Sequence, residues 1–237
     1  MPIIKLKRGK EENLPLLQLG EPAFTTDTNK FFIGNGKVNV EMASAAKLDD
    51  VVNPLNITFS IEPTTAEIGS VINSVVAKWS YNKDIDSQRL NNETLSKDLR
   101  TFTDTSLLKD DKNYTLSVIT LGGSAVSKTI KIDFCNGIYY GKSNSSKYDG
   151  ELIKTLTKVL SDSKARTIAV SSGANEYVFY ALPTRLGTPI FSVNGFNGGF
   201  SKVANGIDFI NTSGYKEKYD IWKSDNANLG TININIK

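Results

Sequence analysis

The sequence of 237 residues contains no histidine. Serine and cysteine triads, imidazole-rich zinc sites and acid–base catalysis by imidazole are therefore excluded in their usual forms. Glycoside hydrolysis by two carboxylates remains as the one enzyme class to consider. Its acidic candidates in the last hundred residues fall in no recognisable motif: Asp149, Glu151, Glu176, Asp208, Glu217, Asp220 and Asp225. We therefore expect a protein that is not an enzyme and that needs no cofactor.

Cysteine is almost as scarce as histidine. The single Cys135 lies between Phe134 and Asn136, near the end of an apolar stretch. One thiol cannot form an internal disulfide, and a nucleophilic thiol needs a neighbouring base that this chain does not supply as histidine. We predict a buried structural cysteine.

Long apolar runs and charge of one sign are also missing. No stretch approaches the roughly eighteen apolar residues of a membrane span, and residues 1–10 lack the apolar core of a secretion signal. We expect synthesis in the cytoplasm and release by assembly or lysis, without membrane insertion. The 28 basic and 25 acidic residues are interspersed. The one basic cluster, at Lys5, Lys7, Arg8 and Lys10, is typical of a charged strand edge, so no nucleic-acid partner is expected.

What the chain does contain is alternating hydrophobicity, in three segments. The first, 1–50, begins with the alternation of Ile3, Lys5 and Lys7 with Ile4, Leu6 and Arg8, which predicts a half-buried strand. Residues 11–19 fit either a short helix or an extended link, and 24–36 fit a hairpin that ends at Gly34-Asn35-Gly36. Residues 48–54 are typical of a linker.

Motifs in this segment carry a family resemblance. In order they are Lys7-Arg8-Gly9, Leu14-Pro15, Gly20-Glu21-Pro22, Phe24 to Thr28, and Ile33 to Gly36. The pattern resembles the N-terminal module of bacteriophage tail-fibre and major-tropism-determinant-type receptor-binding proteins. That resemblance implies a β-prism-like homotrimer that anchors a fibre to a virion and performs no chemistry. The anchor residues that we expect are Leu6, Arg8, Pro22, Phe24, Phe32 and Ile33.

The second segment, 51–134, is predicted to be an immunoglobulin-like β-sandwich. Its strand-like runs are 57–61, 71–80, 114–121 and 129–134, and Trp79 is the expected core indole. The polar stretch 82–104 favours irregular strands, although Glu93 to Arg100 also fits a helix. Clustered oxygen groups at Asp84, Asp86 and 91–93 match no calcium loop, so a solvated loop is expected. The segment resembles the Ig-like spacers of phage fibres.

The third segment, 135–237, is predicted to be a β-sandwich-like distal domain. Residues 151–160 fit either a helix or an interrupted strand, and the strict alternation of 231–237 buries one face. The predicted strands are 137–141, 166–171, 176–181, 190–193, 206–210, 217–223 and 230–236. Motifs at 138–141, 177–180, 183–187, 196–200, 214–222 and 228–231 resemble a C-terminal domain of phage fibre and appendage proteins.

Aromatic residues crowd this third segment. Aromatics left on the surface present an apolar body with a polar tip that suits sugar rings or a partner protein, and the loop residues Tyr148, Phe196 and Tyr215 are the candidates. The turn at 195–200 lacks the following helix of a phosphate-binding loop.

Together these observations predict a homotrimeric virion protein: a tail or baseplate fibre whose distal domain binds a host-surface glycan or protein. Two alternatives remain, a capsid head fibre or decoration protein and a carbohydrate-binding module of a bacterial surface protein.

Overall fold

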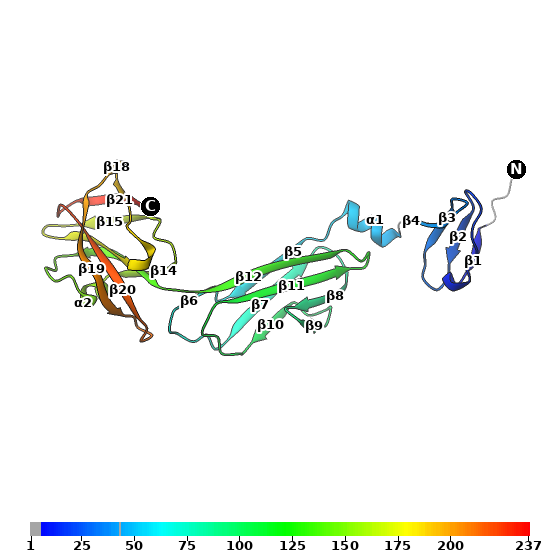
Figure 1. Cartoon of the computed structure of the whole chain (residues 1–237), viewed down its shortest axis with the longest axis horizontal. Coiled ribbons are helices and arrows are strands. Elements are labelled where there is room, and N and C mark those ends of the chain that lie inside the picture. Colours follow the sequence, from blue (N-terminus) through cyan, green and yellow to red (C-terminus); the bar gives the residue numbers. More distant parts are fainter. Residues whose placement is uncertain (1–5, 43) are drawn as a thin grey trace. The chain divides into compact units, whose positions relative to one another are not determined.

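The computed structural model describes residues 6–42 and 44–237, apart from the side chain of Ala45. Strands make up 53% of the chain and helices 8%, so the all-β prediction is confirmed (Figure 1). Two compact units are present, one of Met1–Ile61, Val76–Phe102 and Tyr114–Ile130, the other of Glu62–Val75, Thr103–Asn113 and Lys131–Lys237. The division at 1–50, 51–134 and 135–237 stays a prediction, and its first residues, 1–5, lie outside the described part.

A four-stranded sheet forms the N-terminal part of the first unit. Its order is β1-β2-β3-β4, with β1 parallel to β2 and the other neighbours antiparallel. The link after β1 combines both predicted conformations, because the 3-10 turn η1 (Glu11–Asn13) is followed by extended chain. The strands are β1 (Lys7–Gly9), β2 (Pro22–Thr25), β3 (Phe31–Gly34) and β4 (Asn39–Met42).

A helix, α1 (Ala45–Val52), occupies most of the predicted linker. The Ser44 side chain caps it by accepting a hydrogen bond from the Lys47 amide at 3.1 Å. Lys83 lies 2.7 Å from the carboxylate of Asp50, which also accepts from the Thr120 hydroxyl. The hydrogen bond from Lys83 is the main cause that holds the Asp50 pKa far below its usual value. The linker prediction is wrong here because α1 is fixed by contacts with residues distant in sequence.

No helix among the described residues has the length and apolarity needed to cross a bilayer.

Two sheets follow, with strand orders β10-β7-β5 and β6-β12-β11-β8-β9. Trp79 is buried, as predicted, and its indole N–H donates to Gln88 Oε1 at 2.8 Å. Residues 93–100 hold the short strand β9 and a turn, so the strand alternative is confirmed over the helical one. The Ig-like assignment stays a prediction. The strands are β5 (Ile57–Glu62), β6 (Thr65–Glu67), β7 (Val75–Tyr81), β8 (Ile85–Leu90), β9 (Glu93–Leu95), β10 (Thr101–Asp104), β11 (Lys112–Thr120) and β12 (Ala125–Cys135).

The distal part of the second unit contains two more sheets, with orders β14-β13-β16-β20-β19 and β15-β21-β17-β18 (Figure 1). We call them the first and second distal sheets. The elements of this part are β13 (Gly137–Ser143), α2 (Gly150–Thr155), β14 (Thr157–Leu160), β15 (Arg166–Ser172), β16 (Tyr177–Pro183), the 3-10 turn η2 (Thr184–Leu186), β17 (Phe191–Val193), β18 (Phe196–Asn197), β19 (Phe200–Ile210), β20 (Lys216–Ser224) and β21 (Gly230–Ile236).

The core of this part lies on both faces of the first distal sheet. One apolar cluster joins Val178 and Tyr180 of β16 to Ile232 and Ile234 of β21 in the second distal sheet. Another packs the opposite face of β16, at Phe179, against α2. Strand β16 is therefore buried on both faces, as its nearly continuous apolar sequence requires. The second distal sheet contributes only one face to the core, and its other face is open to solvent.

Residues 151–160 contain both of the structures that the sequence allowed. Asp149 caps α2 by accepting from the amides of Glu151 and Leu152 at 3.0 and 3.2 Å. The helix ends at Thr155, the backbone of Leu156 is already extended, and β14 begins at the next residue. The helical spacing and the strand character belong to successive halves of the segment.

A buried carboxylate connects β6 to the distal strands within the second unit. Glu67 Oε2 lies 2.8 Å from the Thr212 hydroxyl and 3.1 Å from Lys158 Nζ. The side-chain amide of Asn211 donates to the carbonyl oxygen of Ile68 at 2.8 Å. These bonds join β6 to β14 and to the turn between β19 and β20.

Candidate functional site

The N-terminal sheet presents an apolar face formed by two rows of side chains. Strand pairing places Pro22 beside Ile33 and Ile33 beside Val40. The next row runs from Phe24 through Phe31 to Met42, and Arg8 of β1 stands at its end. Side chains opposite one another in neighbouring strands point to the same face. We call Pro22, Phe24, Phe31, Ile33, Val40 and Met42 the apolar face.

The described residues leave much of the apolar face open. Phe31, Val40 and Met42 remain 37%, 42% and 43% exposed. Adjacent exposed apolar side chains on one sheet mark an interaction surface more often than scattered ones do. An apolar sheet face needs a covering layer, and residues 6–42 and 44–237 supply one only for the opposite face.

The opposite face of the same sheet carries a small core. Ala23 and Phe32 are buried there against Leu17, with Leu14 at the margin. Gly34 allows this close packing, because a Cβ at that position would lie 2.6 Å from the Leu17 Cβ. The segment 14–19 therefore covers one face of the sheet and leaves the apolar face free.

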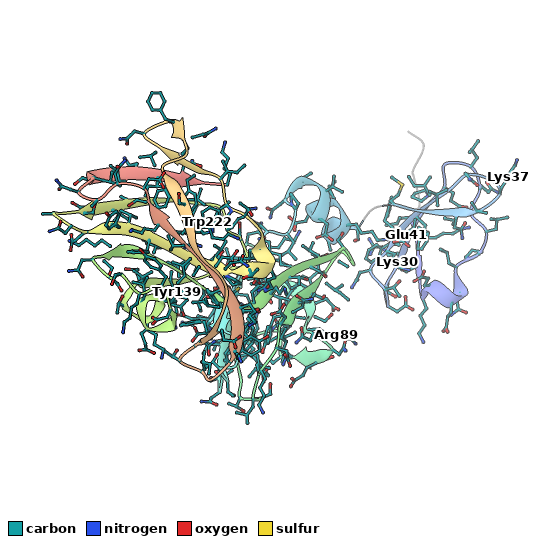
Figure 2. All side chains as sticks on the ribbon, turned by 60° about the vertical axis from the view of Figure 1, so that its left-hand side comes forward. Lys30, Lys37, Glu41, Arg89, Tyr139 and Trp222 are labelled. Atoms are coloured by element: carbon teal, nitrogen blue, oxygen red, sulfur yellow. The ribbon has the colours of Figure 1, made fainter. Side chains whose placement is uncertain are left out.

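Charged groups around this module are paired with one another. Lys30 lies 2.8 Å from Glu11 and 3.5 Å from Glu41 (Figure 2), and Lys7 lies 2.9 Å from Glu21. The hydrogen bond to Glu11 is the main cause that raises the pKa of Lys30. Glu41 stands opposite Phe32, on the core side of the sheet. Among the described residues the apolar face thus contains no carboxylate, and Arg8 is its one flanking cation.

The structure places four of the six predicted anchor residues at this surface. Pro22, Phe24 and Ile33 belong to the apolar face and Arg8 flanks it. Leu6 comes just before β1 and is partly exposed, whereas Phe32 lies on the opposite face, in the chain's own core. The sequence prediction missed Phe31, Val40 and Met42, although the alternation of β3 and β4 was the signal. The anchoring role of the six predicted residues stays a prediction.

The three predicted surface aromatics lie in different places of the second unit. Tyr148 is half-buried against Phe179, with ring centroids 6.1 Å apart, and its hydroxyl lies 3.2 Å from Lys223 Nζ. Tyr215 follows the β19–β20 turn beside Gly69. Phe196 is 81% exposed in the short edge strand β18. In the part of the chain that the structure describes, no contact joins the three, and Phe196 alone is largely free.

The acidic candidates for hydrolysis are engaged in structural contacts. Asp149 caps α2, Glu176 lies 2.9 Å from Lys142, and Asp208 lies 2.7 and 2.6 Å from Lys216 and Lys218. Hydrogen bonds from these partners lower the pKa of Asp208, and bonds from the Gly173 amide and Lys142 lower that of Glu176. A glycosidase general acid needs the opposite shift. The contacts of Asp149, Glu176 and Asp208 are therefore those of structural carboxylates.

The thiol of Cys135 is buried and free, which agrees with a structural residue. Burial, followed by the nearby carboxylate of Asp162, raises its pKa to about 11. The thiolate is the reactive form of cysteine, and at neutral pH this thiol is almost entirely protonated.

Asp220 is the most deeply buried of the seven acidic candidates, and we expect its ionisation to make the unfolding free energy depend on pH. Burial by itself raises its pKa, but hydrogen bonds from Lys202 (2.6 Å), the Gly206 amide and Thr184 (both 2.8 Å) outweigh burial and lower it overall. A lowered folded-state pKa adds stability above the unfolded value of about 3.9, and that stability is lost as the pH falls through the folded value.

The variant Asp220→Asn is expected to lose about 1.5–3 kcal/mol of unfolding free energy at pH 7, the range for hydrogen bonds to a charged group. Denaturant titrations between pH 2 and 7 should show that the difference in unfolding free energy between wild type and Asp220→Asn becomes smaller as the pH falls. Asp208→Asn is the control, since its ion pairs are exposed and are expected to contribute less than about 1 kcal/mol. A difference in unfolding free energy that stays the same at every pH would contradict a stabilising role of the Asp220 carboxylate.

Residues 4–38 match the family model of the major tropism determinant N-terminal domain. The match includes β1, β2 and β3 and therefore most of the apolar face. The resemblance predicted for the N-terminal motifs is thereby confirmed, and those of the middle and last segments stay predictions. No curated protein matches the chain in sequence.

Proposed function

We propose that this chain is a trimeric receptor-binding component of a bacteriophage virion. The N-terminal sheet joins three copies and anchors them to the particle, residues 51–134 act as a spacer, and residues 135–237 contact the host surface. The apolar face, within a module similar to the tropism-determinant domain, is the observation that carries the proposal.

The proposed assembly places the apolar faces of three sheets around a threefold axis, as in a β-prism. Fully burying a Phe, Val or Met side chain stabilises by about 1.5–3 kcal/mol. Phe31, Val40 and Met42 each retain more than a third of their exposure, so each chain contributes three side chains to this gain. The paired charges of Lys7, Lys30 and Glu41 lie off this face, and Arg8, at its edge, is the one charged group among the described residues that assembly would desolvate.

A tail or baseplate position fits this proposal best, because a tropism-determinant domain suggests a protein that meets the host receptor. In that position the purified full-length protein should compete with phage for host cells. We expect micromolar protein to slow phage adsorption, measured as free plaque-forming units over time. An equal concentration of a monomeric variant should inhibit less, since three linked sites bind more tightly than one.

Antibody against residues 135–237 provides the structural part of the test. Gold label at the tail tip or baseplate of intact particles is the expected result. Label distributed over the capsid would favour a head fibre or decoration protein instead. Unlabelled particles, together with unimpeded adsorption, would overturn the proposal.

A further inference from the structure

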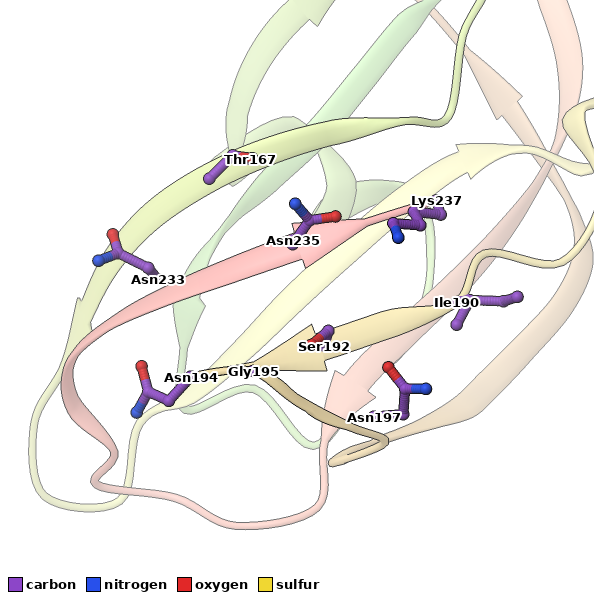
Figure 3. Close-up of a pocket in the computed structure, with 9 residues that line it drawn as sticks. All are labelled: Thr167, Ile190, Ser192, Asn194, Gly195, Asn197, Asn233, Asn235 and Lys237. Atoms are coloured by element: carbon purple, nitrogen blue, oxygen red, sulfur yellow. The ribbon is translucent and has the colours of Figure 1, made fainter.

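The open face of the second distal sheet carries a row of polar side chains that no core requires. Pairing places Thr167 of β15 beside Asn235 of β21, Asn235 beside Ser192 of β17, and Ser192 beside Asn197 of β18. Figure 3 shows these four residues in that order across the strands, with Asn233 in the neighbouring row. Neighbouring strands lie about 4.8 Å apart, so the row extends for about 14 Å.

Asparagine is an unusual residue on the exposed face of a β-strand. It is depleted in strands because its short amide competes for backbone hydrogen bonds, and Thr or Val would stabilise the sheet better. Strand β21 nevertheless alternates buried Ile232, Ile234 and Ile236 with exposed Asn233 and Asn235. The isoleucines account for the inner face of β21, whereas sheet stability gives no reason for the amides outside.

The polar groups of the row are available to a ligand. Within residues 6–42 and 44–237, the side chains of Thr167, Ser192, Asn197 and Asn235 have no hydrogen-bond partner. By contrast, Thr231 and Ser171 on the same face are 3.3 Å apart and bond to each other. Each free amide offers a carbonyl acceptor and two N–H donors, and each hydroxyl offers both functions.

The row lies in a shallow concavity of about 460 Å³. The side chains that line it include no carboxylate, and that of Lys237 is the one charged side chain among them. Ile190, at the rim, is more than half exposed and is the main apolar surface. Many neutral donors and acceptors around a small apolar contact match a ligand that carries hydroxyl and amide groups on an otherwise apolar ring.

Other ligand classes fit this surface less well. A divalent cation requires carboxylate oxygens, and a nucleic acid requires several cations. A protein partner is usually held by buried aromatic or apolar anchors, and no aromatic residue lines the concavity. Phe196 is paired with Val193 and thus belongs to the other side of the strand from Asn197.

We propose that this concavity binds a neutral glycan chain, with Asn233, Asn235 and Asn197 as the hydrogen-bonding residues. The inference rests on the proposed receptor-binding function and names the chemistry of the receptor. A site with a single small apolar contact and exchangeable polar bonds binds weakly by itself. Three copies on one trimer supply the avidity that weak sites need.

The test uses the full-length protein on an array of neutral hexose and N-acetylhexosamine oligosaccharides, with sialylated and phosphorylated glycans as charged competitors. We expect binding to a subset of the neutral glycans. The double variant Asn233→Ala/Asn235→Ala should reduce that binding at least about tenfold, the loss expected for two hydrogen bonds of ordinary strength. Asn144→Ala, an exposed amide in the loop after β13, is the matched control and should bind like wild type. Unchanged melting temperatures would show that all variants fold.

Two results would overturn the inference and leave the proposed function intact. One is a protein that blocks phage adsorption but binds no neutral glycan. The other is glycan binding that survives the double variant, which would place the site elsewhere. The reverse outcome, amide-dependent glycan binding by a protein that neither labels particles nor blocks adsorption, would support the site and reject the phage function.

Discussion

Replacing Phe31 by aspartate is expected to convert the proposed trimer into a monomer. The substitution places a carboxylate in the middle of the apolar face, beside Phe24 and Met42. Burying three such charges around one axis is unfavourable, because each loses its hydration without gaining a partner. Light scattering should report a mass that falls from three times 26.0 kDa to 26.0 kDa.

Leu19→Asp is the matched control for this substitution. Leu19 is 81% exposed and belongs to the same module, but it lies outside the apolar face. The control should keep the wild-type mass and still assemble into particles, whereas Phe31→Asp should do neither. A wild-type protein of 26.0 kDa at every concentration would contradict the assembly itself. A trimeric Phe31→Asp variant would move the contact to another surface.

The neighbouring substitution Phe32→Ala is expected to unfold the N-terminal sheet. Phe32 is the largest member of a core that otherwise contains Leu17 and Ala23, with Leu14 at its margin. Truncating a buried Phe to Ala costs about 3–5 kcal/mol, and such a small core has little stability in reserve. Hydrogen exchange should show lost protection across β2 to β4, while peptides from β11, β16 and β20 keep theirs.

Leu16→Ala controls for the removal of an apolar side chain in this module, since Leu16 is exposed beside the buried Leu17. It should leave exchange in β2 to β4 unchanged. Persisting protection in the Phe32→Ala variant would mean that contacts between chains, rather than this small core, hold the sheet. Phe31 and Phe32 thus separate assembly from folding at adjacent positions.

Alternation along the chain predicted most of the sheet structure. The strict pattern at 231–237 correctly buried the isoleucines of β21, and the apolar run at 176–181 became the doubly buried strand β16. Trp79 was correctly assigned to a core because a large indole in a strand has few other favourable positions.

Features that depend on distant residues were not predictable in the same way. Helix α1 is held by Asp50 through Lys83 and Thr120, and Gly122 allows the close approach, since a Cβ there would lie 2.6 Å from the Ala46 carbonyl oxygen. The Ser44 cap was a local signal, but an eight-residue helix needs such contacts to persist.

The candidate sites show the same limit. Motif resemblance brought Pro22, Phe24 and Ile33 to attention, but strand register was needed to add Phe31, Val40 and Met42 and to assign Phe32 to the opposite face. The row of polar side chains on the second distal sheet could not be found from the sequence, because three strand pairings bring together residues from 167 to 235. Surface aromatics drew attention to Tyr148, which the fold uses to cover Phe179.

The carboxylate of Glu67 has a mechanical consequence. A hinge between β6 and the distal strands would have to separate Glu67 from Lys158 and Thr212 and release the carbonyl oxygen of Ile68 from Asn211, all at once. A force applied to the distal strands would therefore be transmitted through these bonds into β6 and its partner β12. We therefore expect this part of the chain to resist bending between β6 and the distal strands.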